Sequence, residues 1–169
     1  MAGRQLSSRR WATFALHTGD WLLATGDLRK MAGYSGTPLV KKIGIKPGHR
    51  IAVLNPPRGF EKELTPLPEG VVNAAGAPLD VAILFAASQS ALEKSLGKLA
   101  RKLAPAGMLW VAWPKMTSGV STDLKEGLVQ RIGLAAGLVD IKVCAVNEVW
   151  SGLKFVIPVK DRKTVSSRQ

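Results

Sequence analysis

Residues 79–85 read Leu-Asp-Val-Ala-Ile-Leu-Phe, and residues 108–113 read Met-Leu-Trp-Val-Ala-Trp. Both runs are almost wholly apolar, which is typical of strands in a parallel sheet that helices cover on both faces. The capping-box pair Ser90 and Glu93 stands between them and predicts a helix start. From there a leucine recurs every three or four residues, the spacing of one helix face: Leu92, Leu96, Leu99 and Leu103. The stretch predicts a strand–helix–strand unit with a right-handed crossover.

The same alternation extends in both directions along the chain. Upstream, a short helix with Thr37 as its N-cap and Gly44 as its stop is followed by an apolar strand at 51–54. Downstream, a helix from Ser121/Thr122 to Gly137 is followed by two strands, 141–149 and 153–159, joined through Ser151-Gly152. The prediction is a three-layer, Rossmann-like α/β fold with a mostly parallel sheet that ends in an antiparallel hairpin.

The 169 residues fit one domain of ordinary size, and 46% hydrophobic residues with a mean hydropathy of +0.10 supply a packed core. We expect one Rossmann-like domain over 31–160 and a polar tail over 161–169. We interpret residues 1–30 as an extension or leader, because the chain becomes more regular after Met31. The longest apolar run, 81–87, is too short to span a membrane, so we expect a cytoplasmic protein.

The formal charge of +12 is spread along the chain rather than gathered in one block. Spread lysines are typical of a solvated surface. Nucleic-acid binding stays open as an alternative, through the basic side chains of the helix after residue 90: Lys94, Lys98, Arg101 and Lys102. The single cysteine, Cys144, excludes an internal disulfide framework, and no clustering of histidines and carboxylates predicts a metal site.

Two stretches resemble the class I methyltransferase variant of the Rossmann fold: 45–54, which is similar to the approach to that family's first motif, and 103–111, which is similar to its central loop and strand. Three further segments, 31–38, 110–115 and 148–154, resemble in order a small bacterial family known as domain of unknown function 3052. The first resemblance implies a fold and an S-adenosylmethionine site. The second implies a bacterial source and no particular chemistry.

The turn after the first strand departs from the methyltransferase pattern. It reads Asn55-Pro56-Pro57-Arg58-Gly59-Phe60 where that family has a glycine-rich loop whose N–H groups approach the cofactor. Two prolines donate no N–H, and no carboxylate ends the first strand. We therefore expect a degenerate cofactor turn and no cofactor, and we favour a non-enzymatic role while leaving an enzymatic one open.

Ligands of open α/β sheets bind at the carboxyl ends of the strands. This rule nominates Asn55 and Arg58 after the first strand, Ser88 after the second, and Lys115 with Ser118 after the third; Tyr34 is a candidate flap over the cleft. Lys115 can also be interpreted as a surface lysine, Arg58 as an exposed loop arginine, and Tyr34 as part of a flexible leader. Trp110 and Trp113 are expected to point to opposite faces of the sheet, as packing residues.

The leading hypothesis is a methyltransferase-like domain that binds a small anionic ligand or a protein partner without catalysis. The first alternative is an atypical S-adenosylmethionine-dependent methyltransferase. The second is a basic protein associated with nucleic acid. The sequence leaves the oligomeric state open.

Overall fold

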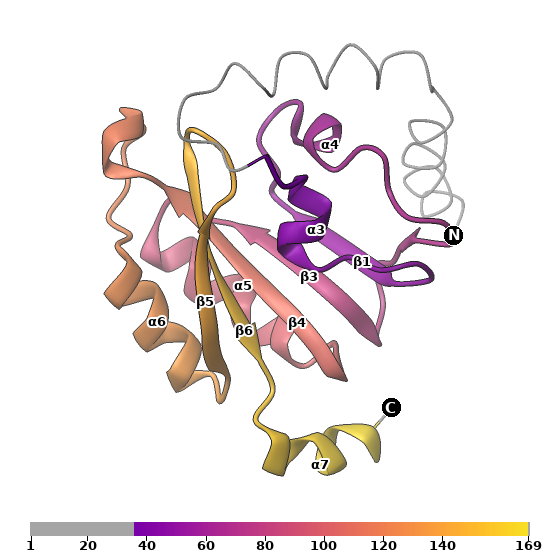
Figure 1. The fold of residues 1–169 in the computed structure, drawn as a ribbon. Helices are drawn as coiled ribbons and strands as arrows, with labels where there is room; N and C mark the ends of the chain where they lie inside the picture. Colours follow the sequence, from indigo (N-terminus) through magenta and orange to yellow (C-terminus); the bar gives the residue numbers. More distant parts are fainter. Residues whose placement is uncertain (1–35, 169) are drawn as a thin grey trace, which may run out of the picture.

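The structure, a computed structural model, describes residues 36–168, so Tyr34 and the leader lie outside the described residues. Its centre is a six-stranded sheet in the order β2-β1-β3-β4-β6-β5. Strands β2 (Val72–Asn73), β1 (Arg50–Leu54), β3 (Leu79–Phe85) and β4 (Leu103–Pro114) are parallel. Strand β6 (Trp150–Val156) is antiparallel both to β4 and to β5 (Val139–Ala145). The predicted mostly parallel sheet with an antiparallel hairpin is confirmed (Figure 1).

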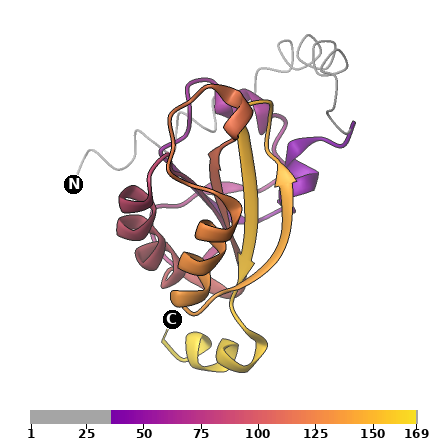
Figure 2. The same cartoon turned by 90° about the vertical axis from the view of Figure 1, so that its left-hand side faces the viewer.

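Helices cover both faces of the sheet, as Figure 2 shows. Helices α5 (Gln89–Ala100) and α6 (Glu126–Ala135) lie on one face, and the short helices α3 (Leu39–Ile43) and α4 (Phe60–Glu63) lie on the other. The buried side chains form two clusters, one on each face. Trp113 belongs to the α5–α6 cluster and Trp110 to the α3–α4 cluster. The three layers and the opposite orientation of the two tryptophans are therefore confirmed.

Helix α5 begins earlier than the predicted capping box. Its N-cap is Ser88, whose Oγ accepts from the Ala91 N–H at 3.3 Å. It ends at Ala100, and Leu103 already pairs with Leu79 as the first residue of β4. The leucine spacing fits a helix through residue 103, but the pairing with β3 takes precedence there.

Helix α6 begins later than predicted, at Glu126 rather than at Ser121/Thr122. Residues 119–125 instead fold back over the start of α5. The Asp123 carboxylate accepts from the Gln89 N–H at 2.8 Å, and the Thr122 hydroxyl donates to the Ala87 carbonyl at 2.7 Å. The Asp123 side chain thus caps the start of α5 rather than the start of α6, and Thr122 attaches the same segment to Ala87.

The hairpin turns at residues 146–149, not at Ser151-Gly152, which lie inside β6. Gly152 is needed there because a Cβ would come within 2.9 Å of Val146 Cγ2 and 3.3 Å of the Trp110 ring. The chain continues through a 3₁₀ turn, Val159–Asp161, into helix α7 (Arg162–Ser166), where a polar tail was predicted. None of the helices in the described part is both long and apolar enough to cross a membrane.

Candidate functional site

The turn between β1 and α4 lies at the carboxyl edge of the sheet, the upper edge in Figure 1. Asn55 has a φ of 54°, and Gly59 has a φ of 83°. Both are left-handed conformations, which asparagine and glycine tolerate best. A Cβ on Gly59 would meet nothing within 4 Å. The two predicted site residues of this turn, Asn55 and Arg58, are exposed at an open surface.

The turn offers more backbone N–H donors than its two prolines suggest. The Phe60 N–H donates to the Pro57 carbonyl at 3.1 Å, which closes a β-turn with Arg58 and Gly59 at its two central positions. Neither of the N–H groups at these two central positions has a hydrogen-bond partner within residues 36–168. Two amides thus remain available, although Pro56 and Pro57 contribute none.

The end of β2 is the second part of this edge. In the methyltransferase pattern a carboxylate in this region contacts the ribose of the cofactor. Here β2 ends at the half-buried Asn73, and the buried Ala74 follows, its N–H bonded to the Ile51 carbonyl at 2.7 Å. A neutral amide side chain stands where a carboxylate was expected, and it provides both an acceptor and donors.

The structure gives Ser88 and Ser118 local roles in the backbone. Ser88 caps α5. The Ser118 hydroxyl donates to the Lys115 carbonyl at 2.6 Å and accepts from the Val120 N–H at 3.3 Å, within the turn that follows β4. Their hydrogen bonds are those of capping and turn residues, a role that the sequence analysis did not assign to either.

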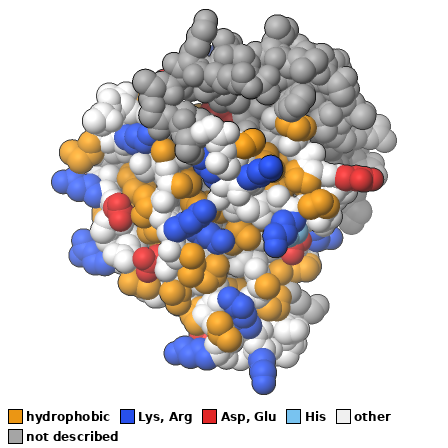
Figure 3. Space-filling model, in the orientation of Figure 1, with side chains coloured by type: hydrophobic (Ala, Val, Ile, Leu, Met, Phe, Trp, Pro, Cys, Tyr) orange, Lys and Arg blue, Asp and Glu red, His pale blue; other side chains and the backbone are white. Residues whose placement is uncertain are grey.

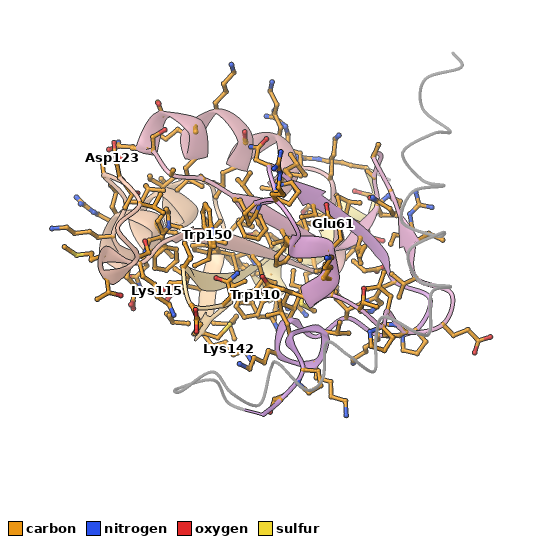
Figure 4. The ribbon with its side chains drawn as sticks, turned by 90° about the horizontal axis from the view of Figure 1, so that it is seen from above. Glu61, Trp110, Lys115, Asp123, Lys142 and Trp150 are labelled. Atoms are coloured by element: carbon orange, nitrogen blue, oxygen red, sulfur yellow. The ribbon has the colours of Figure 1, made fainter. Side chains whose placement is uncertain are left out.

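Lys115 is half-buried and contacts the β5–β6 loop. Its Nζ donates to the Asn147 carbonyl at 2.7 Å, and its N–H donates to the Val149 carbonyl at 2.7 Å. The lysine therefore anchors the segment after β4 to the loop before Trp150 (Figure 4). The structure brings Asn55 and Arg58 together on one loop and Lys115 with Ser118 on another.

Asn147 and Glu63 form a link that the sequence did not reveal. The Asn147 Nδ2 donates to Glu63 Oε1 at 2.8 Å, and its Oδ1 accepts from the N–H groups of Val149 and Trp150. The other carboxylate oxygen, Glu63 Oε2, is buried without a hydrogen-bond partner. Burial raises the pKa of Glu63, and the hydrogen bond from Asn147 opposes that rise. The residues are 84 positions apart, so no local pattern connects them.

Three aromatic rings pack beneath α4. Phe60 and Phe85 meet edge to face with centroids 4.6 Å apart, and Phe85 and Trp150 do the same at 5.0 Å. Phe60 and Phe85 are fully buried. The rings occupy the space between α4 and the ends of β3 and β4, and Trp150 packs over this end of the sheet.

A cavity of about 710 Å³ lies at the opposite edge of the sheet, between the ends of α5 and α6 and helix α7. Its lining includes Gly97, Arg101, Gly137, Leu138, Val165 and Arg168. It is separate from the predicted ligand site.

Several solved structures share this architecture. A SAM-dependent methyltransferase from Aquifex aeolicus is 14% identical, with 79% of this chain and 98% of that chain covered and a TM-score of 0.49. A possible exported protein from Bordetella parapertussis is 10% identical, with coverages of 80% and 67% and a TM-score of 0.51. The chain has a methyltransferase-like Rossmann fold. No protein-family model and no curated protein matches it, so the resemblance to domain of unknown function 3052 stays a prediction.

The prediction that the chain takes no cofactor is wrong. Solved structures of similar fold include SAM-dependent methyltransferases, among them a magnesium protoporphyrin IX methyltransferase from Synechocystis solved with bound SAM. That protein is 13% identical, with 71% of this chain and 74% of that chain covered and a TM-score of 0.41.

The β1 edge offers groups that would hold such a cofactor in an altered form. The N–H groups of Arg58 and Gly59 would take the place of part of the glycine-rich cradle, and a Cβ on Gly59 would meet nothing within 4 Å. The Asn73 side chain would take the place of the carboxylate near the ribose. The two prolines remove two donors from the turn, and the two residues after them supply N–H groups without a partner among residues 36–168.

Proposed function

We propose that this protein binds S-adenosylmethionine at the Asn55–Gly59 turn and is an atypical methyltransferase. The observation that carries the proposal is the open turn at the carboxyl end of β1, with two left-handed residues and two unused N–H groups. It lies in a sheet whose strand order and antiparallel β6 are those of the methyltransferase fold. Open α/β sheets bind their ligands at such an edge.

The turn supplies three kinds of contact. The Arg58 guanidinium is exposed and suited to the ligand's carboxylate, which it can bind through two parallel hydrogen bonds. The amides of Arg58 and Gly59 would donate to ligand oxygens, and the Asn73 amide would accept from a ribose hydroxyl. When bound, the cofactor supplies an activated methyl group. Lys115 and Asn147 keep the neighbouring loops in place through the hydrogen bonds described above.

Calorimetric titration of S-adenosylmethionine and S-adenosylhomocysteine into the full chain tests the proposal. Arg58→Gln removes a charge-assisted contact worth roughly 1.5–3 kcal/mol, so binding should weaken about tenfold or more. Lys62→Gln is the matched control, because Lys62 is an exposed cation on the adjoining helix α4. Its affinity should stay within about twofold of the wild type.

Absence of binding heat at millimolar ligand, or equal affinity in the two variants, would contradict the proposal. Binding without methyl transfer to any acceptor offered would support the site and reject the enzyme. The chain would then be a ligand-binding domain, the reading that the sequence first favoured.

A further inference from the structure

One half of the sheet face on the α3 side has no helix over it among the described elements. Helix α3 is five residues long and ends above β4, where the Trp110 Nε1–H donates to the Ile43 carbonyl at 3.0 Å. Beyond it, Trp110 pairs with Lys154 of β6, and Lys154 pairs with Lys142 of β5. Cross-strand partners point to the same face of a sheet, so both lysines lie on the α3 side.

Three lysines gather on this uncovered half, and we call Lys46, Lys142 and Lys154 the lysine face. The Lys142 Nζ lies 5.9 Å from the centroid of the Trp110 ring, as Figure 4 allows the reader to follow. Lys154 is half-buried, and its pKa is lowered by burial first and then by the charges of Lys142 and Lys46. These two lysines are therefore close enough to Lys154 to repel its charge.

No carboxylate balances the lysine face within residues 36–168, where none of the three forms an ion pair. The acidic residue of β5, Asp140, pairs with Phe155 on the other face and accepts from Gln130 Nε2 at 3.0 Å. Figure 3 shows lysine and arginine side chains across the middle of this side of the molecule. Like charges held together without a counter-charge attract an anion, more strongly where they are partly desolvated.

We propose that the lysine face docks the phosphodiester backbone of a nucleic acid. Lysines act as point charges toward phosphate, and spaced lysines on a flat sheet face fit a chain of phosphates. Trp110 is buried beneath Lys142, so it is not placed to stack on a base. The contact is thus electrostatic and independent of base sequence.

Two other occupants fit less well. A second copy of this chain would oppose the same cations, and the edge strand β5 has a pairing irregularity between Asp140 and Lys142 that disfavours strand addition. The chain's own N-terminal residues 1–35 are themselves basic, with two acidic residues, Asp20 and Asp27, against Arg4, Arg9, Arg10, Arg29 and Lys30. Neither supplies the missing negative charge.

The test is fluorescence anisotropy of the full chain with labelled 20-nucleotide single-stranded RNA, single-stranded DNA and duplex DNA, over a range of salt concentrations. The variant is K46Q/K142Q/K154Q. The matched control is K94Q/K98Q/R101Q, which removes the same charge from exposed positions of α5 and the residue after it, on the other face. Thermal unfolding checks that both variants fold, and the single variant Lys142→Glu, at an exposed position, replaces the triple one if it does not.

We expect the lysine-face variant to bind at least about tenfold more weakly than the wild type. The slope of log K against log salt should become shallower by about 2–3. The α5 control should bind within about threefold of the wild type. Equal losses in both variants would overturn the proposal, since net charge alone would then explain binding. Binding to none of the three oligonucleotides, or preference for polyglutamate over all of them, would overturn it as well.

Discussion

At the scale of single residues, Trp110 and Trp113 show how one residue type can have two surroundings on one strand. Both are buried in β4, on opposite faces. The Trp110 Nε1–H donates to the Ile43 carbonyl, whereas Trp113 makes no such hydrogen bond within residues 36–168. That bond fixes the end of α3 on the sheet.

Trp110→Phe should therefore destabilise the protein more than Trp113→Phe. Both substitutions remove a similar volume, but only the first leaves the buried Ile43 carbonyl without its donor, at a cost of about 1–3 kcal/mol. Urea denaturation followed by circular dichroism measures the difference. Equal losses in the two variants would show that the hydrogen bond contributes nothing.

Glu63 should make stability depend on pH. Burial raises its pKa above the ordinary value of 4.5, so the folded state binds the proton more tightly than the unfolded state. The resulting stabilisation is complete below pH 4.5 and is lost as the pH rises through the raised pKa. The Glu63→Gln variant has no carboxyl group to lose this stabilisation. The free energy of unfolding of the wild type should therefore fall relative to that of the variant between about pH 4 and pH 8.

Glu61→Gln on the same helix is the control for Glu63, since it removes the same charge without touching the hydrogen bond between Asn147 and Glu63. Urea denaturation at a series of pH values distinguishes the two. A Glu63→Gln variant whose pH profile parallels that of the wild type would disprove the assignment.

At the scale of elements, α6 depends on a glycine that allows close approach to the sheet. A Cβ on Gly133 would overlap the Phe155 ring of β6. Gly97 of α5 is also inside a helix, but a Cβ there would meet nothing within 4 Å.

Gly133→Ala should destabilise the protein by roughly 1–3 kcal/mol, because α6 must shift away from β6. Gly97→Ala should stabilise it by roughly 0.5–1 kcal/mol, through the gain in helix propensity. Thermal unfolding of the two variants gives the comparison. Stabilisation by both substitutions would mean that α6 does not pack as described.

The sequence predicts the existence and type of most elements better than their ends. Strands β1, β3 and β4 are buried on both faces, so their residues form apolar runs that are visible in the sequence. Helix α5 is buried on one face, so its leucines recur every three or four residues. The start of α6 could not be predicted in this way, because Asp123 bonds to Gln89 of α5 and Thr122 bonds to Ala87 just before it, 34 and 35 positions away. From the sequence, Gly152 is predicted to be a turn residue. The structure shows instead that it lies within β6, where Trp110 and Val146 leave no room for a side chain.

At the scale of the whole molecule, the alternation of strands and helices and the antiparallel hairpin were predictable, and the candidate site only in part. The turn at Asn55–Gly59 follows from the rule that ligands bind at carboxyl ends, but its two unused amides depend on the β-turn that the prolines precede. The Glu63–Asn147–Lys115 contacts and the lysine face join distant segments, so only the folded chain brings them together.

The measurement that tests the central proposal most directly is a titration of S-adenosylhomocysteine into isotope-labelled protein, followed by amide chemical shifts. We predict the largest, saturable shifts at the Arg58 and Gly59 amides and at the Asn73 side chain, with little change around the cavity by α7. Saturable shifts confined to that cavity, or no shifts at millimolar ligand, would contradict the proposed site.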